Sequence, residues 1–466
     1  MKSCIIFGAG EMGRKAYIKL SNFFDIQYYS DNDKTKHGKF LNNKEIISPE
    51  KAVELSLKEN IQLVICSGYY IDIIISLKEK GINDFIVVLD GYIYNYDIDD
   101  GVLIDYECEK PKPYLKESID EKNILFVQNH PCIRTNKIAK IIKEYGYKVF
   151  LMYVDTPSVD GSYTYKEIYS DVFTFTSLDA MLNFVNESEF DLIHSSNEPD
   201  DLTVLLLNSN KKIVYDCHDM ESIRGSDNSS KMTLEYIACT QSDGVMYTSQ
   251  GVNDIAYKKY HRTNNILVLE NMIYEPFILD KKKEKLSNKD GEIHCVFEGG
   301  IITNNINSHR YMNSMWQKFA EQKIHIHFYS TSNINSCLEL DNISEYIHYE
   351  GKLPLNELIS EMTKYDCGLA LFNVTERNKA YLKSDSFNKM YEYINSQLPI
   401  VTNMEYQFFN CDIEEVSFLL DFDKDIRKQI ITACNIKVPE DYLEKHDLIM
   451  KARGPELFDF YNKISN

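Results

Sequence analysis

The sequence predicts an α/β protein built from three successive units, each of which alternates short buried strands with helices. Apolar runs typical of buried parallel strands recur along the chain, among them Cys4–Phe7, Ile124–Val127 and Cys295–Phe297. The first two runs lead through a turn into a stretch with helical periodicity, which is the order of elements in a sheet of parallel strands. With 466 residues, the chain is long enough for about three domains of ordinary size.

The first unit, residues 1–105, opens with a strand that runs directly into Gly8, Gly10 and Gly13, spaced as GxGxxG. A helix, a second strand and then Asp31 follow, which is the context of a Rossmann-like nucleotide-binding unit. In that arrangement Gly8 permits a tight turn, Gly10 lets a phosphate approach and Gly13 lets helix and strand pack closely. The Asp31 carboxylate can accept hydrogen bonds from a ribose. Whether the unit binds NAD, a nucleotide sugar or nothing stays open.

Two further features bear on this unit. Asp31-Asn32-Asp33 has an Asp-x-Asp spacing that would suit a magnesium or manganese ion on a diphosphate. The glycine loop before it favours the acidic turn of a second strand, so we expect no metal. The strands at 61–66 and 85–89 complete a sheet of four short parallel strands. The run Tyr28–Pro49 resembles the small Rossmann-like module of sugar O-acyltransferases and other polysaccharide-biosynthesis proteins.

Residues 106–122, with Pro111 and Pro113 among charges, are predicted to be a linker. The second unit, residues 123–280, places polar groups where its strands end, which is where open α/β sheets bind ligands. They are Gln128-Asn129-His130 after one strand, Glu198-Pro199 after another, and Asp216-Cys217-His218-Asp219 after a third. An imidazole such as that of His218 can donate or accept a proton near neutral pH.

The third unit, residues 288–440, begins with a strand that ends at Gly299-Gly300. Later in this unit, apolar residues at helical spacing between Ser384 and Asn395 predict a helix with one buried face. That helix carries Glu392 and is followed by a turn and a short buried strand. Residues 441–466 are predicted to form terminal helices that cross back over the preceding domain.

The segment NKMYEYINSQLPIV, residues 388–401, resembles a conserved stretch of GT-B glycosyltransferases, especially those of the family 4 type. Other segments resemble this family in the same order along the chain. They are DLIH with the following EP, the strand leading to His218, SDGVMYTS at 242–249, and HYEGKLP with the later DCGLALF. The resemblance implies two facing Rossmann-like domains, an acceptor domain at 123–280 and a donor domain at 288–440.

The resemblance also implies roles for individual residues. Glu392 would hold the ribose of a nucleotide-diphosphate sugar, and His218 would act at the reacting sugar, oriented or charged by Asp216 or Asp219. The diphosphate would lie against the glycine turn and the helix start, where free N–H groups attract anions. Those donor-binding residues are Gly299, Gly300, Lys383, Ser384, Asp385, Asn388 and Lys389. The implied reaction is a retaining, metal-independent transfer to a hydroxyl of a surface polysaccharide, a glycolipid or a protein glycan, with no cofactor.

Two alternatives remain open from the residues alone. No Arg or Lys follows Gly300 until Arg310, so positive charge for a diphosphate is expected from Arg377, Lys379 or Lys383. This spacing also fits a non-catalytic subunit that binds a nucleotide sugar or assists assembly. The glycine loop of the first unit fits an NAD(P)-dependent oxidoreductase, although this unit has no Tyr-x-x-x-Lys pair to serve as proton donor.

Composition narrows the range of partners. The chain carries 51 basic and 71 acidic residues, a formal net charge of -20, which argues against nucleic-acid binding and against attraction to anionic membranes. Its 11 cysteines include no CxxC pair, so we expect a reduced cytoplasmic protein without a disulfide framework or a zinc site. No segment has the signature of a signal peptide or the roughly 20 apolar residues of a membrane span, which leaves only peripheral membrane association open.

Overall fold

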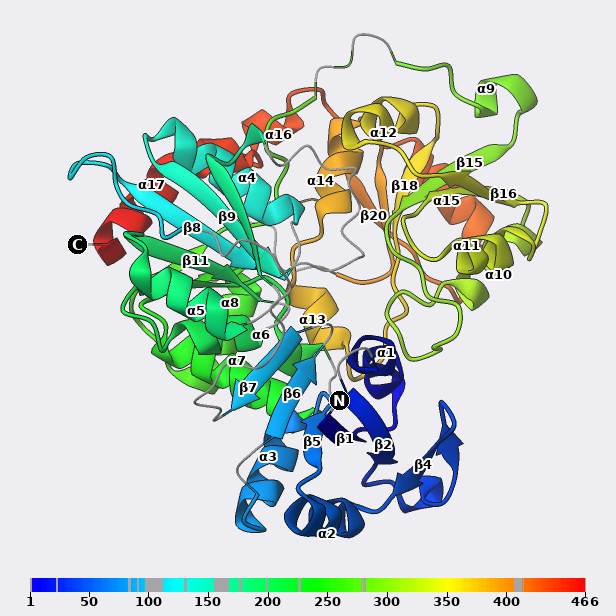
Figure 1. Ribbon diagram of the computed structural model, residues 1–466. Helices are drawn as coiled ribbons and strands as arrows, with labels where there is room; N and C mark the ends of the chain where they lie inside the picture. Colours follow the sequence, from blue (N-terminus) through cyan, green and yellow to red (C-terminus); the bar gives the residue numbers. More distant parts are fainter. Residues whose placement is uncertain are drawn as a thin grey trace. The chain divides into compact units, whose positions relative to one another are not determined.

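The computed structural model describes residues 2–21, 24–82, 85–89, 92–96, 112–129, 132–154, 167–175, 178–197, 200–224, 228–277, 279, 282–405, 413 and 415–465. The chain forms two compact units. The first comprises Met1–Asp216, Ser226–Val245 and Lys463–Asn466, and the second comprises Cys217–Gly225 and Met246–Asn462. Each unit is built around parallel sheets flanked by helices (Figure 1).

The N-terminal sheet of the first unit has the strand order β3-β4-β2-β1-β5-β6-β7 (Figure 1, blue). The pairs β4-β2, β2-β1, β1-β5 and β5-β6 are parallel, whereas β3-β4 and β6-β7 are antiparallel. The sheet therefore extends the four parallel strands expected from the sequence by β4 and two antiparallel edge strands. Its strands are β1 (Lys2–Phe7), β2 (Phe24–Ser30), β3 (Phe40–Leu41), β4 (Lys44–Ile47), β5 (Gln62–Ile65), β6 (Phe85–Leu89) and β7 (Tyr92–Tyr96).

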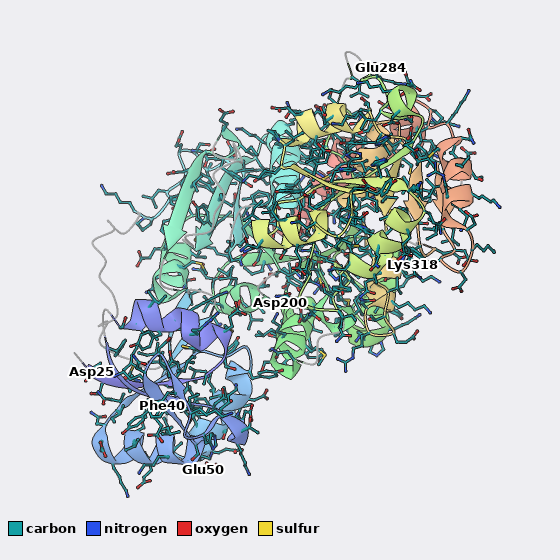
Figure 2. The ribbon with its side chains drawn as sticks, turned by 90° about the vertical axis from the view of Figure 1, so that its right-hand side faces the viewer. Asp25, Phe40, Glu50, Asp200, Glu284 and Lys318 are labelled. Atoms are coloured by element: carbon teal, nitrogen blue, oxygen red, sulfur yellow. The ribbon has the colours of Figure 1, made fainter. Side chains whose placement is uncertain are left out.

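Both faces of this sheet are covered, as expected for parallel strands that read as continuous apolar runs. Cys4 and Ile6 of β1 share a buried cluster with α1 (Glu11–Leu20). Ile5 and Phe7 point to the other face, into a cluster that includes α2 (Pro49–Glu59) and α3 (Tyr70–Glu79). The short helix η1 (Lys34–Lys36) follows β2, and Phe40 on the edge strand β3 is exposed; Figure 2 labels it among the side chains of this module.

The second sheet contributes the order β10-β9-β8-β11-β12 to the first unit, with parallel pairing throughout these five strands. The chain passes into the second unit within the next strand, β13 (Gly244–Tyr247). The strands are β8 (Asn123–Gln128), β9 (Lys148–Val154), β10 (Asp171–Phe175), β11 (Leu192–Ser196) and β12 (Lys212–Cys217). The helices of this part are α4 (Ile133–Glu144), α5 (Leu178–Glu187), α6 (Asp200–Leu206) and α7 (Ser229–Gln241).

The two sheets of the first unit share one buried core. The cluster under α3 continues without interruption into residues of β8, β9 and α5. Two hydrogen bonds join the start of α7 to the N-terminal module: Asn228 Nδ2 donates to the carbonyl of Gly68 at 3.0 Å, and Ser230 Oγ donates to Asp72 Oδ2 at 3.2 Å. The N-terminal module is therefore part of the first unit and not an independently packed domain.

The sheet of the second unit has the order β17-β16-β15-β18-β19-β20, and its strands are parallel. Cys295 and Phe297 face a core with α10, α11 and α15, whereas α14 packs against β18 and β19. The strands of this sheet are β15 (Ile293–Glu298), β16 (Ile324–Tyr329), β17 (Ile347–Gly351), β18 (Cys367–Ala370), β19 (Ile400–Thr402) and β20 (Ser417–Leu419). The strand β14 (Ile266–Val268) instead follows β13 in the order of the second sheet.

Helices of the second unit are mostly short. They are η3 (Glu221–Ile223), α8 (Gln250–Tyr260), α9 (Ser287–Asp290), α10 (Asn313–Glu321), α11 (Ile334–Asp341), α12 (Leu355–Met362), α13 (Lys379–Ser384), α14 (Asn388–Asn395), α15 (Ile426–Cys434), α16 (Tyr442–Lys445), η4 (Met450–Arg453) and α17 (Gly454–Ser465). The helix expected to start at Ser384 is interrupted: Ser384 ends α13, and α14 begins only at Asn388. Among the described helices, none combines the length and apolar character needed to cross a membrane.

Candidate functional site

The glycine turn after β15 lies beneath two cationic side chains. Gly299 has a φ of +132°, which a residue with a side chain rarely adopts. A Cβ atom on Gly299 would lie 3.1 Å from Lys389 Nζ, and a Cβ on Gly300 would lie 2.9 Å from Arg310 Nη1. An ammonium and a guanidinium therefore approach the backbone at successive positions of one turn. The N–H groups of Gly299 and Ile301 already donate to the Tyr329 carbonyl at 3.1 Å and to Ser332 Oγ at 2.9 Å. What the turn offers to an anion is therefore the positive charge of the two side chains.

Arg310 reaches this turn because the chain between β15 and α10 folds back on itself. The Ile302 N–H donates to the Arg310 carbonyl at 3.0 Å, which closes the loop. Asn373, which follows β18, fixes the same loop: its N–H donates to the His309 carbonyl at 2.9 Å, and its Nδ2 donates to the Ser308 carbonyl at 3.0 Å. The sequence placed Arg310 too far from Gly300 to suggest this contact.

A third cation, Arg224, belongs to the same electrostatic environment. Burial and nearby positive charges lower the pKa of His309 to about 3, so this imidazole is neutral at pH 7. Those positive charges are on Arg310, Arg224 and Lys389. Arg224 follows η3, and its guanidinium lies 5.7 Å from the ring centre of Tyr381. Three cations around one neutral histidine favour an anion of more than one charge.

Lys389 is held over two aromatic rings. Its Nζ lies 4.0 Å from the ring centre of Phe297 and 5.1 Å from that of Phe372, distances at which cation–π attraction acts. Burial lowers the pKa of Lys389 to about 8, while the negative charges of Glu298 and Glu392 oppose that shift. The ammonium is thus weakly hydrated, and an incoming anion interacts with it more strongly than with a solvated lysine.

Helix α14 carries both Lys389 and Glu392, three residues apart on one face. Glu392 is buried, with 6% of its surface exposed. Tyr393 fixes the helix to the sheet, because its hydroxyl accepts from the Glu298 N–H at 3.1 Å and donates to the Leu369 carbonyl at 3.2 Å. The ring fits only because residue 368 is glycine, since a Cβ there would lie 2.3 Å from the ring of Tyr393.

Two acids, the buried Asp385 and the partly exposed Asp219, lie beside the end of α13. Tyr381 donates to Asp219 Oδ1 at 2.8 Å, and Thr248 Oγ1 donates to Asp385 Oδ1 at 2.6 Å. Burial, followed by the negative charge of Asp219, raises the pKa of Asp385 to about 7. One carboxyl of this pair can therefore hold a proton near neutral pH. Arg224 Nε lies 4.0 Å from Asp219 Oδ1 and offsets part of the repulsion.

The predicted catalytic residues fall into different surroundings. His218 is partly exposed and directly precedes Asp219, in the loop that leads to Arg224. Asp216 belongs to the first unit, where it is fully buried and accepts from Arg134 Nε at 2.8 Å and Nη2 at 3.0 Å. Burial alone would raise its pKa, but Arg134 and His194 hold the pKa of Asp216 far below its usual range. Its carboxylate is thus committed to a buried ion pair, so Asp219 is the better candidate to assist His218.

The predicted donor-binding residues divide in the same way. Ser384 and Asp385 are buried and contact the start of α8, where Ser249 Oγ donates to the Ser384 carbonyl. Asn388 opens α14 and is partly exposed, as is Lys383. Lys379 is exposed and lies 3.9 Å from Glu376, and Arg377 is exposed as well. The cations seen in contact with the glycine turn are Lys389 and Arg310.

In the N-terminal module the glycines adopt the expected turn, but Asp31 serves the loop itself. A Cβ on Gly8 would lie 2.3 Å from the Cys66 carbonyl oxygen, and one on Gly13 would lie 1.8 Å from the Gly8 oxygen, whereas Gly10 is unobstructed. Asp31 Oδ2 accepts from the Ala9 N–H and from Lys36 Nζ, both at 2.9 Å. The carboxylate that was expected to bind a ribose thus accepts a hydrogen bond from the glycine loop itself.

Three predictions lie outside the described residues: His130, the Glu198-Pro199 pair and the first part of the linker, residues 106–111. The rest of the linker is described. Lys116 Nζ pairs with Asp191 Oδ1 at 2.6 Å, and its N–H donates to Glu189 at 2.8 Å, so residues 112–122 lie against the second sheet.

Comparison with known proteins decides the fold. No family model matches the sequence, and no curated protein matches it. Among solved structures, a sucrose-phosphate synthase from Thermosynechococcus elongatus aligns over 74% of this chain and 99% of its own, with a TM-score of 0.56 and 9% identity. Alr3699/HepE from Anabaena, solved in complex with UDP-glucose, aligns over 73% and 99%, with a TM-score of 0.54 and 13% identity. The chain has the GT-B fold.

The GT-B fold confirms the fold class expected from the sequence, an α/β protein with Rossmann-like domains. Both solved structures are matched over nearly their full length, whereas about a quarter of this chain lies outside the alignments. At these identities the comparison establishes the fold alone. What the GT-B fold does in this chain is argued below from the residues.

Proposed function

We propose that the protein is a glycosyltransferase that moves a sugar from a nucleotide-diphosphate donor to a hydroxyl acceptor. The observation that carries this proposal is the contact of Lys389 and Arg310 with the Gly299-Gly300 turn. Cationic side chains over a glycine turn suit a diphosphate, and the GT-B fold makes a nucleotide sugar the ligand to expect. Because the HepE structure contains UDP-glucose, uracil is the first base to test in the donor nucleotide.

The chemical task of this site is to stabilise the departing nucleoside diphosphate. Negative charge develops on the phosphate oxygen as the bond to the sugar breaks, and fixed donors aimed at that oxygen lower the barrier. Lys389 and Arg310 supply such donors, and Arg224 adds long-range attraction. Glu392 on the same helix would accept hydrogen bonds from the ribose hydroxyls. These cations can perform the task without a metal, in keeping with a metal-independent transfer.

His218 is the residue that we assign to the reacting sugar, and Asp219 is its partner in the chain. Tyr381 and Arg224 hold Asp219 in place, so its charge is fixed beside the histidine-bearing loop. Retention of configuration and an acceptor hydroxyl on a polysaccharide, a glycolipid or a protein glycan are parts of the same proposal. The occupied loop of the N-terminal module gives the oxidoreductase alternative no support.

Calorimetric titration of UDP, GDP and NAD into four forms of the protein tests the donor site. The forms are the wild type, Arg310→Met, Glu392→Gln and the control Lys379→Met, which removes an exposed cation from the neighbouring helix. We expect one nucleoside diphosphate to bind, at least tenfold more weakly to Arg310→Met and Glu392→Gln, and equally well to the control. Binding of NAD alone, or equal binding by all four forms, would refute the proposal.

A second step separates an enzyme from a binding subunit. The sugar nucleotide that matches the preferred base is incubated with the protein in the presence of a chelator, and its hydrolysis is followed by NMR. Release of the sugar as the donor's own anomer supports a retaining, metal-independent enzyme. Tight binding without turnover, even with candidate acceptors added, would leave the non-catalytic subunit as the correct function.

A further inference from the structure

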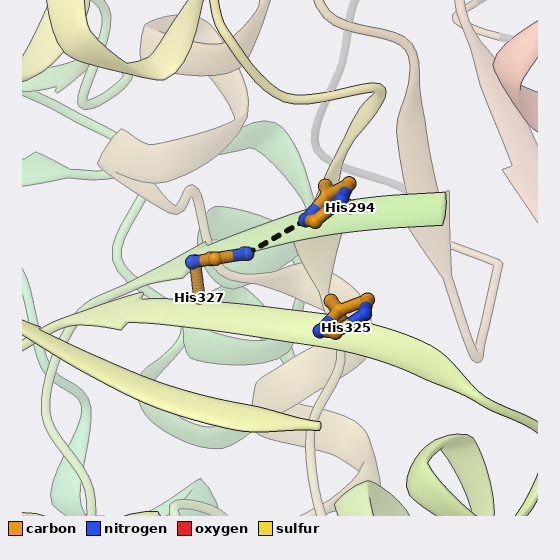
Figure 3. A group of neighbouring side chains, drawn as sticks. All are labelled: His294, His325 and His327. Carbon is orange, nitrogen blue, oxygen red and sulfur yellow. Dashed lines mark hydrogen bonds between the residues drawn. The ribbon is translucent and has the colours of Figure 1, made fainter. Parts of the chain in front are cut away.

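Four histidines gather on one face of the sheet in the second unit, far along the strands from the glycine turn. His294 lies near the start of β15, His325 and His327 lie on β16, and His348 lies on β17. His294 is the register partner of His325, and His327 is the register partner of His348, so all four side chains leave the sheet on the same side. Figure 3 shows three of these rings gathered over the two strands.

Two carboxylates fix the orientation of the central pair. His294 Nε2 lies 3.0 Å from Asp290 Oδ2, and His327 Nδ1 lies 2.6 Å from Glu350 Oε1. An ionised carboxylate can only accept. Each histidine must therefore carry its proton on the nitrogen that faces the acid.

The other nitrogens of this pair then face each other without a proton. His294 Nδ1 and His327 Nε2 are 2.9 Å apart, as the dashed line in Figure 3 marks. If both imidazoles are neutral, two lone pairs are directed at one another at this distance. The contact is favourable only when a cation lies between them, either a proton or a metal ion.

A third histidine completes a set suited to a metal. One nitrogen from each of His294, His325 and His327 lies within 4.8 Å of the others. His325 Nδ1 is 2.8 Å from His348 Nε2, so the fourth histidine orients the third. A carboxylate that accepts from the far nitrogen of a ligand, as Asp290 and Glu350 can here, is a usual outer partner of a metal-bound histidine. At a zinc–nitrogen distance of about 2.0 Å, tetrahedral ligand atoms lie about 3.3 Å apart. Binding would therefore turn the rings of His294 and His325 out of their stacked arrangement, in which the ring centres are 4.5 Å apart.

We propose that His294, His325 and His327 bind one divalent transition-metal ion of the zinc class, with Asp290, Glu350 and His348 as orienting residues. Three imidazoles without a thiolate suit zinc, nickel or copper and not the harder magnesium or calcium. The site joins β15 to β16, so bound metal should brace the sheet. The metal site is also separate from the donor site, because His294 and Gly299 are five positions apart on an extended strand, a distance of roughly 16 Å.

Calorimetric titration of Zn²⁺ into untagged protein that has been freed of metal by chelation tests this site. We expect one ion per chain, with an affinity at least tenfold weaker in His294→Gln and in His327→Gln. The control His261→Gln, which changes an exposed histidine of the same unit, should bind zinc like the wild type. Thermal denaturation should show a higher Tm with zinc in the wild type and in the control only.

The spectrum of Co²⁺ in the wild type gives a test that needs no variant to fold. A tetrahedral histidine site gives intense visible bands without the near-ultraviolet thiolate band that cysteine ligands such as Cys295 or Cys367 would produce. Failure of the wild type to bind one equivalent of zinc overturns the proposal, and the pair then shares a proton. A thiolate band, or equal loss in the His261→Gln control, overturns it as well.

Discussion

Lys389 shows at the scale of one residue how the surroundings adapt a common side chain to its proposed task. Its ammonium lies over two aromatic rings and above a glycine whose missing side chain leaves room for it. The same burial that lowers its pKa to about 8 removes the water that would otherwise weaken its attraction for a phosphate. The residue is therefore suited to bind an anion, and its positive charge is lost as the pH rises past about 8.

This leads to a prediction for the pH dependence of donor binding. The charged form of Lys389 is present below a pKa of about 8 and is lost above it, so the affinity for UDP should fall as the pH rises from 7 to 9. One lysine in about ten remains charged one unit above its pKa, which corresponds to an affinity about tenfold lower. Titration calorimetry at three pH values measures it. Lys389→Met should bind weakly at every pH, and a wild-type affinity that stays constant to pH 9 would contradict the role of this ammonium.

Asp385 supports a second prediction, which concerns stability. Its pKa is about 7 in the folded protein against an ordinary value of 3.8. The folded state therefore holds more protons than the unfolded state between about pH 4 and 7, and its contribution to the free energy of unfolding falls as the pH rises through that window. In Asp385→Asn this fall should be absent. Above pH 7 the variant should be more stable than the wild type by on the order of 1 kcal/mol or more.

Urea denaturation of the wild type and Asp385→Asn at pH 5, 6, 7 and 8 provides the measurement. The amide oxygen of asparagine can still accept from Thr248 and from the Ser386 N–H, which both bond one oxygen of Asp385. If the difference between the two proteins does not change with pH, Asp385 is not the group that takes up the proton.

Individual site residues were predictable only where a local motif marks them. Glu392, Lys389 and the Gly299-Gly300 turn stand in segments whose order along the chain indicates a donor domain. The sequence did not identify Arg310 and Arg224 as parts of the candidate site, because their place depends on a loop that folds back and on a segment remote in sequence. The histidines at 294, 325 and 327 were missed for the same reason: strand register, not spacing in sequence, brings them together.

At the scale of elements, α14 is the part on which the candidate site depends. Its position relative to the sheet is fixed by Tyr393, whose ring lies over Gly368 and whose hydroxyl bonds to β15 and β18. The helix therefore carries Lys389 and Glu392 at a set height above the glycine turn. A substitution of Gly368 beneath the Tyr393 ring should therefore lower both the stability of the protein and its affinity for the donor nucleotide.

Gly368→Ala tests this dependence. A Cβ only 2.3 Å from the ring must push Tyr393 and α14 away from β18, and such overpacking typically costs about 1–3 kcal/mol. We expect a lower Tm in thermal denaturation together with weaker UDP binding. Gly10→Ala is the matched control, because nothing lies within 4 Å of the added atom. A variant at 368 that melts and binds like Gly10→Ala would show that α14 is not held in this way.

Elements with a continuous apolar run were predicted well, and interrupted ones were not. The strand expected at 85–89 coincides with β6, and those expected near 4–7 and 124–127 lie within β1 and β8. The apolar spacing after Ser384 did predict a helix, but it could not reveal the break between α13 and α14. That break follows from tertiary contacts, since Asp385 and Ser384 are bonded to Thr248 and Ser249. The edge strands β3 and β7 are short or antiparallel and were missed.

At the scale of the whole molecule, the continuous core of the first unit is the main unexpected feature. The sequence suggested a module at 1–105 joined to the next domain by a linker. The structure instead has one cluster of buried side chains that extends from α3 to β8 and α5. No pattern in either segment indicates this, because the apolar residues of each would bury equally well within a separate domain.

The contact of Asn228 with Gly68 joins the N-terminal module to α7. A substitution that breaks this contact is therefore expected to destabilise the N-terminal sheet and the second sheet together. Asn228 caps α7 by accepting from the N–H groups of Ser230 and Lys231, and its amide also donates to Gly68. Asn228→Ala removes both functions and should cost about 1 kcal/mol for the cap alone. Asn228→Asp keeps the cap and removes only the donor. Hydrogen exchange should show lower protection in β5 and β8 together in Asn228→Ala, and a smaller joint loss in Asn228→Asp. Loss confined to α7 would indicate independent parts.

The carboxylate of Asp31 within its own glycine loop has a practical meaning for anyone who would redesign this protein. A loop of this kind is usually an open receptor for a nucleotide, but here it is already satisfied from inside the chain. The GxGxxG motif alone therefore does not indicate that this module binds a nucleotide cofactor. To make the module accept a dinucleotide, one would first have to replace Asp31 and Lys36, which frees the Ala9 N–H of the loop. New contacts to the dinucleotide could be added only after that.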